Sequence, residues 1–169
     1  MQDDVAQQIV ALLPRLRRYA LTLSRAADVA DDLVQTACVR ALSTRPDLDD
    51  GKRFEAWIFK VVRNLWLDLL RRRKVRGEEI DVGARDDLIV VQAEQDSERR
   101  MLLRSVATAM DDLPAEQREV VLLVCVEQVT YHEAATILDM PIGTVMSRLA
   151  RARRRLAEAV EKEPAVASC

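Results

Sequence analysis

Aromatic residues and glycines are scarce in this chain: 4% of its 169 residues are aromatic, and only four are glycine. Alanine, leucine, valine, arginine and glutamate dominate instead, a composition that favours helices packed on helices. Histidine occurs once, as His132, so no cluster of metal ligands or base partners for catalysis can be assembled around it. We therefore expect an all-α protein that is not an enzyme, with no catalytic residue, no metal site and no cofactor, and with His132 exposed to solvent or beside a helix cap.

Cysteines and long apolar runs are also few. Cys38, Cys125 and Cys169 form no CxxC pair, and the first two fall in apolar helical stretches, where a free cysteine usually acts as a small hydrophobe. The longest apolar run, 120–126, is far too short to cross a bilayer, and no secretory signal is present. These absences predict a reduced, cytoplasmic protein without membrane insertion.

The charge is unevenly distributed, although the net charge is only −2. Residues 1–75 carry 14 basic and 10 acidic side chains, a net of +4, and residues 76–97 carry 2 and 7, a net of −5. Residues 98–169 carry 10 and 11, but the basic ones gather in the final helical stretch. Because phosphate responds to a local patch and not to the average, the acidic pI does not exclude DNA binding.

The last third of the chain, 113–156, has the pattern of a helix-turn-helix. Thr130 followed by Glu133 forms a capping box that begins a helix. That helix should end near Asp139, because the residue before Pro141 is pushed out of helical geometry. Asp139 is expected either to hold some strain in this turn or to adopt the left-handed conformation.

The helix that follows has two faces. An apolar stripe recurs at helical spacing, at Ile142, Val145, Leu149, Ala152 and Leu156. The opposite stripe is polar and is formed by Thr144, Ser147, Arg148, Arg151 and Arg155. Arginines near a C-terminus can simply solvate a surface helix and favour its dipole. The capped helix and proline turn before it favour instead a recognition helix for a DNA major groove.

The N-terminal block predicts three further helices. The first has its apolar stripe at Ile9, Leu12, Leu13, Leu16, Ala20 and Leu23, and Pro14 is expected to split it in two. Asp28 is expected to cap the second helix, whose core face is Val29, Leu33, Ala37, Ala41 and Leu42. The other face of that helix displays Asp31, Asp32, Gln35 and Arg40.

The third predicted helix is long, from about Phe54 to Arg73. Its inner stripe is Phe54, Ile58, Val61, Leu65 and Leu69. Trp57 is expected near this stripe, and Trp66 is expected to pack against a neighbouring helix. Another face carries Lys60, Asn64 and Arg71, with Arg63 beside them. Two glycines and seven acids then mark residues 76–97 as an acidic linker, with a short apolar run at 88–91. Two roles remain open for it: a solvated tether, or an autoinhibitory strap over the basic helices.

Several of these stretches resemble sigma-70-type sigma factors of the extracytoplasmic-function group, which keep only the second and fourth sigma regions. The similarity lies in DVADDLVQTACVRAL at 28–42, FEAWIFKVVRNLWLDLLRRR at 54–73, and YHEAATILDMPIGTVMSRLARARRRL at 131–156. The start LPRLRRYALTLS at 13–24 also resembles the general-stress sigma factors of alphaproteobacteria. The resemblance implies region 2 at 1–75, a linker at 76–97, region 4 at 98–160 and a tail at 161–169.

The resemblance also implies roles for the polar faces. Asp31, Asp32, Gln35 and Arg40 match the surface that docks on the β′ clamp helices of core RNA polymerase. Lys60, Arg63, Asn64 and Arg71 match the helix that melts and recognises the −10 element, whereas Thr144, Ser147, Arg148, Arg151 and Arg155 match the −35 recognition helix. The expected partners are core polymerase, through β′ and β, promoter DNA and an anti-sigma factor.

Physical chemistry supports assigning the melted −10 strand and the duplex −35 element to two different helices. A melted strand needs a basic groove and base pockets, whereas a duplex element suits a helix in the major groove. An ordinary helix-turn-helix regulator that does not bind polymerase remains the alternative, but no ligand or dimerisation module is visible. A nuclease fits least, given the single histidine.

Overall fold

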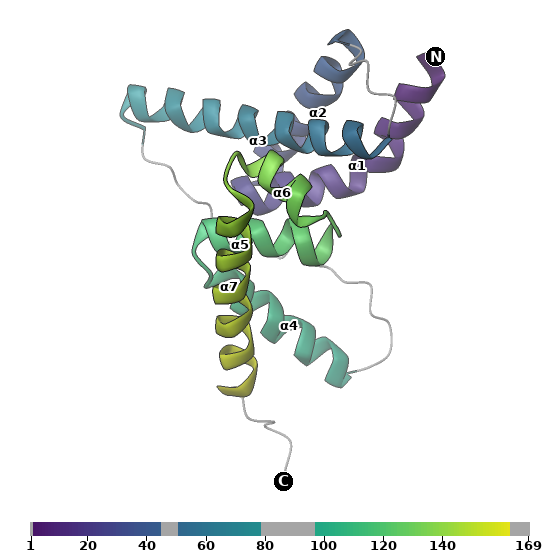
Figure 1. Cartoon of the computed structure of the whole chain (residues 1–169). Coiled ribbons are helices and arrows are strands. Elements are labelled where there is room, and N and C mark those ends of the chain that lie inside the picture. The colour runs from purple at the N-terminus through teal and green to yellow at the C-terminus, as the bar shows by residue number, and fades with distance from the viewer. Residues whose placement is uncertain (1, 45–50, 79–96, 163–169) are drawn as a thin grey trace.

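The computed structural model describes residues 2–44, 51–78 and 97–162, and within them every regular element is helical. The N-terminal half forms α1 (Gln2–Ser24), α2 (Ala27–Thr44) and α3 (Gly51–Arg76). The C-terminal half forms α4 (Ser97–Asp111), α5 (Ala115–Val121), the π-helical segment η1 (Leu122–Val126), α6 (Tyr131–Leu138) and α7 (Ile142–Lys162) (Figure 1). The predicted all-α fold is confirmed. Residues 79–96, most of the predicted acidic linker, lie outside the described residues.

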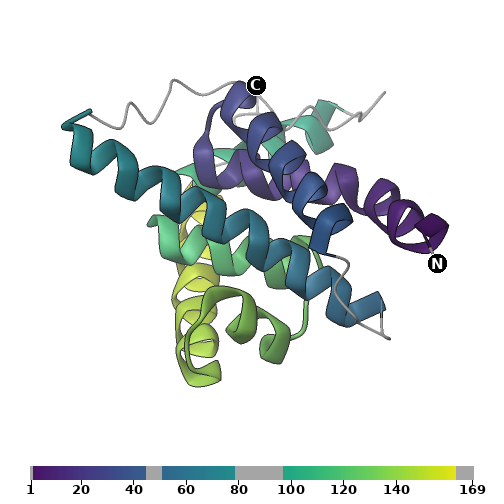
Figure 2. The ribbon, with the colours of Figure 1, turned by 90° about the horizontal axis from the view of Figure 1, so that it is seen from above.

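The two halves pack directly on each other. Helices α1 and α2 lie side by side, and α3 passes between this pair and α6 of the C-terminal half (Figure 2). Helix α7 packs against α4, α5 and α6, and α1 also touches α5. Buried residues of both halves therefore form one continuous hydrophobic cluster, from Ile9 near the start of α1 to Ala152 in α7.

Helix α1 differs from its prediction at two positions. It is one continuous helix with Pro14 inside it, so the expected split was wrong. Pro14 and Val10 are both exposed, and water can therefore satisfy the Val10 carbonyl that loses its helical partner. Leu13 is 38% exposed and does not belong to the core stripe, which Tyr19 joins instead.

Helix α2 begins at Ala27, before the predicted cap, so Asp28 lies in its first turn and does not cap it. The preceding Ser24 makes the local bonds: its hydroxyl accepts from the Ala26 amide and donates to the Ala26 carbonyl. Ala30, Leu33, Val34, Ala37 and Ala41 are buried, whereas the predicted core residue Leu42 is 49% exposed. Small alanines let α2 lie close to α1, and Asp28 still favours the helix dipole.

Helix α3 extends three residues beyond the predicted range at each end. It ends at Arg76, and the next residue, Gly77, has a left-handed φ of 68° that suits glycine. The Gly77 amide donates to the Lys74 carbonyl and the Glu78 amide donates to the Arg73 carbonyl, which is the Schellman pattern. Phe54, Ile58 and Val61 are buried as expected, and both tryptophans are half-buried against the core.

The helix-turn-helix has the predicted geometry. The Thr130 hydroxyl accepts from the Glu133 amide at 3.2 Å, and the Glu133 carboxylate accepts from the Thr130 amide at 2.9 Å, which completes the capping box. Asp139 ends α6 in the left-handed conformation, with φ 54° and ψ 49°. The Pro141 carbonyl then accepts from the Thr144 and Val145 amides and starts α7.

Helix α7 is held by Val145, Leu149 and Ala152, each at most 2% exposed, with Leu156 half-buried. Ile142 was predicted to join this stripe, but it is 44% exposed because it lies at the turn, before α7 reaches its packing partners. Arg118 supports the same region from α5. Its guanidinium donates to the carbonyls of Met110 and Asp111 at the end of α4 and of Leu113 just beyond it, and burial lowers its pKa.

Tyr19 should remain protonated in the folded chain at pH values where a free phenol ionises. Burial, together with Glu119, raises its pKa well above the ordinary value of 10.0. A raised pKa stabilises the folded state fully below pH 10, and that stabilisation is lost as the pH rises toward the folded value. In a Tyr131→Phe variant, which retains only this tyrosine, phenolate absorbance should appear together with loss of helical circular dichroism. Phenolate absorbance near pH 10 with intact helicity would contradict the burial of Tyr19.

Candidate nucleic-acid interface

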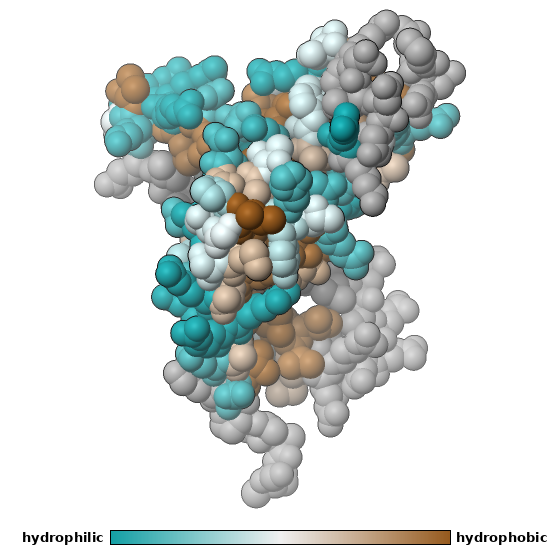
Figure 3. All heavy atoms as spheres, viewed as in Figure 1, coloured by the Kyte–Doolittle hydropathy of each residue, from teal (hydrophilic) through white to brown (hydrophobic). Residues whose placement is uncertain are grey.

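The polar stripe of α7 lies on the surface, as predicted. Ser147, Arg151 and Arg155 are exposed, and Thr144 is half-buried at the start of the helix. The visible length of α7 is mostly hydrophilic, and a hydrophobic area lies beside it over α4 (Figure 3), where Met101, Leu102 and Val106 are exposed. One face of α7 is thus buried and the other is open, which is the arrangement a groove-binding helix requires.

Arg148 is the one member of the predicted stripe with an ion-pair partner among the described residues. Its guanidinium lies 2.9 Å from the carboxylate of Glu116 in α5, and its side chain is only 25% exposed. Glu116 itself is 70% exposed, so this pair is shallow and costs little to break. Arg148 can therefore leave Glu116 without disturbing the core.

Packing of the two halves covers part of the basic face of α3 and leaves the rest exposed. Asn64 and Arg71 are exposed, Lys60 is half-buried, and Arg71 pairs with Asp68 one turn earlier at 2.8 Å. Arg63 is only 17% exposed and donates to the Glu119 carboxylate of α5 at 2.9 Å. The four predicted residues thus share a helix, but Arg63 faces the C-terminal half and not solvent.

Glu119 joins Arg63 to α1 as well. The Tyr19 hydroxyl donates to the same Glu119 oxygen at 2.7 Å, and the Tyr19 ring packs edge-on against Phe59 with centroids 5.2 Å apart. One carboxylate of the C-terminal half therefore holds two helices of the N-terminal half. No local sequence pattern indicates this contact, because its partners lie 56 and 100 positions from Glu119 in the chain.

The polar face of α2 is exposed, as predicted. Asp32, Gln35 and Arg40 are exposed, and Asp31 forms an ion pair with Arg17 of α1 at 2.7 Å. Both members of that pair are close to half-exposed, so it contributes little to stability. The face is available to a partner because the opposite face of α2 is already packed on α1 and α3.

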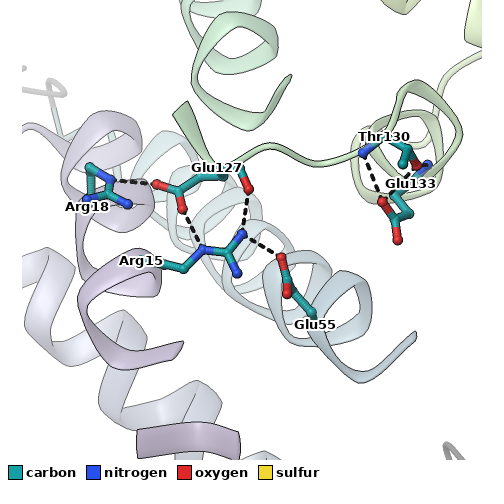
Figure 4. Close-up of polar contacts among 6 residues, drawn as sticks. All are labelled: Arg15, Arg18, Glu55, Glu127, Thr130 and Glu133. Carbon is teal, nitrogen blue, oxygen red and sulfur yellow. Dashed lines mark hydrogen bonds and ion pairs between the residues drawn. The ribbon is translucent and has the colours of Figure 1, made fainter. Parts of the chain in front are cut away.

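A second polar contact, which was not predicted from the sequence, joins the halves at Glu127, just after η1. The side chain of Glu127 is fully buried, and its two oxygens accept from Arg15 at 2.8 Å and from Arg18 at 2.6 Å (Figure 4). Arg15 also donates to the Glu127 carbonyl, pairs with Glu55 of α3, and lies over the Phe59 ring. Removing one partner from such a buried pair typically costs about 3–5 kcal/mol.

A signal for Glu127 was present in the sequence. Val120, Leu123 and Glu127 are spaced by three and four residues, so they share one helical face, and the first two are fully buried. An acid in a core position needs a cationic partner. That spacing identifies the buried acid but not its partner, because Arg15 and Arg18 lie more than 100 positions away.

Other sequence expectations can be placed on the structure. His132 is exposed, and Cys125 is also exposed, with its sulfur 3.7 Å from Arg153, so it is not the buried hydrophobe expected. Among the described residues, no group of histidine, cysteine and acidic side chains could hold a metal. None of the described helices is long and apolar enough to span a membrane. What the fold presents is a helix-turn-helix with a second basic helix, which defines a DNA-binding protein.

Comparison with known proteins defines the family. Residues 9–76 match the family model described as Sigma-70 region 2, and residues 103–156 match the model described as Sigma-70, region 4. The ECF RNA polymerase sigma factor EcfG of Rhodopseudomonas palustris is 35% identical over 156 residues, which cover 92% of this chain and 84% of that protein. The RNA polymerase sigma factor CnrH of Cupriavidus metallidurans is 30% identical, covering 94% and 85%. The chain belongs to the extracytoplasmic-function group of the sigma-70 family.

Solved structures agree with this assignment. The sigma factor RpoE from Bartonella quintana, in complex with the anti-sigma factor NepR, matches with a TM-score of 0.75 and 30% identity over 95% of this chain and 98% of that one. CnrH in complex with the cytosolic domain of CnrY matches with a TM-score of 0.65 and 25% identity, covering 96% and 91%. The two-region helical architecture expected from the sequence is therefore confirmed.

Two adjacent substitutions in α7 should separate DNA contact from stability. Arg148→Ala should weaken binding to a duplex by about 1–3 kcal/mol if this arginine contacts a guanine, with little change in thermal stability. Leu149→Ala should instead lower the free energy of unfolding by roughly 2–5 kcal/mol, because it leaves a core cavity. Fluorescence anisotropy with a duplex enriched from a random pool by the holoenzyme, and thermal melts, measure the two effects. If both variants lost only stability, the assignment of the two faces would be reversed.

Proposed function

We propose that this chain binds core RNA polymerase and directs it to promoters at which transcription then begins. The observation that carries this function is that both sigma regions occur in one chain, each with a basic helix suited to a different form of DNA. Helix α7 suits a duplex −35 element, and α3 suits a melted −10 strand. The alternative, a regulator acting without polymerase, leaves the basic face of α3 and the polar face of α2 without a role.

We further propose the domain limits and residue roles. Region 2 comprises 1–75, the linker 76–97, region 4 98–160 and the tail 161–169. Core polymerase would bind Asp31, Asp32, Gln35 and Arg40 on α2, and the −10 strand would bind Lys60, Arg63, Asn64 and Arg71. The −35 duplex would bind Thr144, Ser147, Arg148, Arg151 and Arg155. The protein acts by binding and not as an enzyme, in the cytoplasm where polymerase works.

Control by an anti-sigma factor is part of the same proposal. Two solved relatives are bound to such factors, NepR and the cytosolic domain of CnrY. Near the end of α3, half-buried Leu67 and Leu70 line a shallow open groove with Arg71, Lys74 and Glu78. An amphipathic helix with apolar anchors and acidic flanks would fit this groove, while the rest of the inhibitor covers α2 and α7. Stress would then act on the inhibitor.

Core binding should depend on the polar face of α2. Asp32→Arg combined with Gln35→Ala should abolish holoenzyme formation and leave helicity intact, because both side chains are exposed and the apolar face is already committed to the domain. A pull-down with purified core and transcription from an enriched promoter measure the result. Glu161→Arg, an exposed acid reversed in the same way on α7, is the matched control and should bind core normally. Undiminished assembly of the α2 variant would remove this assignment.

Promoter melting should depend on the exposed part of α3. Lys60→Ala combined with Asn64→Ala should reduce the permanganate reactivity of −10 thymines several-fold, because the strand loses a phosphate contact and a base contact. Binding to core and to the −35 duplex should be retained. Arg72→Ala, on the same helix and also exposed, is the control and should melt the promoter as the wild type does. Equal melting by both variants would show that α3 does not hold the strand as proposed.

A further inference from the structure

An apolar strip runs along the exposed side of the recognition helix α7, beside its polar stripe. Ile142 and Met146 are 44% and 51% exposed, and Ala150 is exposed as well. Four-residue spacing places these three side chains one above another on the same side of the helix. The strip is separate from the buried stripe that contains Val145 and Leu149, so packing of the core does not explain why it is apolar.

The position of this strip favours contact with bases. In a helix-turn-helix the N-terminal residues of the recognition helix contact the base edges, and Ile142 and Met146 lie in the first two turns of α7. Ile142 lines a shallow open hollow with Thr136 and other residues of α6 and the turn. Met146 lies one turn further along and is followed by Ser147, a residue of the proposed −35 surface. Met146 therefore belongs to the part of α7 that enters the groove.

The chemistry of the groove limits what a methionine can recognise there. The major groove presents one apolar group, the C5 methyl of thymine, whereas its other distinguishing groups are hydrogen-bond donors and acceptors. A methionine side chain has no donor, and its sulfur is only a weak acceptor. The side chain is also unbranched and flexible, so it adapts to an irregular surface. The thymine methyl is thus the group in the groove that Met146 matches.

We propose that Met146 is a specificity-determining residue that contacts the C5 methyl of a thymine in the −35 element. The proposal rests on the proposed function, because it requires that α7 binds a duplex. Ala150, one turn later on the same strip, has a small side chain that lets the helix backbone come close to the bases. Met146 discriminates between base pairs, whereas the arginines of α7 supply affinity for any sequence.

Charge and sequence recognition are therefore separated on α7. Residues 140–157 contain no acid, so no side chain of this stretch repels phosphates. Arg151, Arg154 and Arg155 are exposed and can neutralise phosphates whatever the base sequence. Met146 carries no charge, and salt screens only interactions between charges. Loss of its side chain should change the preference for thymine and leave the salt dependence of binding unaltered.

The test uses holoenzyme assembled from core polymerase and the full chain, with a promoter duplex enriched from a random pool by the wild type. Each thymine of the −35 element, on either strand, is replaced in turn by deoxyuridine, which lacks only the C5 methyl. At one of these positions the replacement should weaken wild-type binding about four-fold. That change corresponds to about 0.8 kcal/mol, the contribution of one buried methylene-sized group. Met146→Ala holoenzyme should bind the thymine and deoxyuridine duplexes equally.

Two further variants serve as controls. Met101→Ala removes a methionine that is 56% exposed but lies on α4, so it should retain the full effect of deoxyuridine. Met146→Leu keeps an apolar side chain of similar size and should retain the effect as well. Circular dichroism establishes that each variant is folded. For Met146→Ala the slope of log affinity against log salt concentration should equal that of the wild type.

Two binding results would overturn the proposal: full wild-type affinity for every deoxyuridine duplex, or an undiminished deoxyuridine effect in folded Met146→Ala. The first needs no variant, so it holds even if the substitution impairs folding. An enriched −35 element without an A·T pair would overturn the proposal as well. Failure of the proposed function is distinguishable, because a wild-type holoenzyme that enriched no duplex at all would remove that function and the inference with it.

Discussion

The buried carboxylate of Glu127 is the constraint on which the relative placement of the two halves depends. An acid cannot be left unpaired in a core, so region 4 must present Glu127 to Arg15 and Arg18 of α1. Arg15 is in turn placed by Glu55 and by the Phe59 ring of α3. Glu119 repeats the arrangement with Tyr19 and Arg63. The packing of the two halves on each other follows from these polar bonds together with the continuous apolar cluster.

The same contacts explain why two of the candidate binding surfaces are exposed and the third is partly covered. The polar faces of α2 and α7 are largely open, because each helix uses its other face for packing. The basic face of α3 is partly covered, because α3 lies between the α1–α2 pair and α6 (Figure 2). The proposed polymerase surface on α2 is therefore exposed, whereas the proposed −10 surface on α3 is partly covered.

Local sequence signals identified most helices because their causes are local. A capping box, a proline turn and a helical stripe act within a few residues, so α6, its end at Asp139 and the buried face of α7 were predictable. The errors have equally local reasons. Pro14 was expected to break α1, but Val10, whose carbonyl loses its helical partner, is exposed to water. Leu13 and Leu42 were assigned to the core by periodicity, although they are 38% and 49% exposed.

The sequence by itself determined the all-α class, the helix-turn-helix, the basic helices and the family, because each depends on residues close together in the chain. Only the tertiary structure decided that Arg63 faces Glu119, that Arg148 pairs with Glu116, and that Glu127 is buried between two arginines. Two of these three contacts join residues from different regions. Spacing along a helix predicts which face a side chain occupies. The residue that it contacts on that face depends on how separate helices pack.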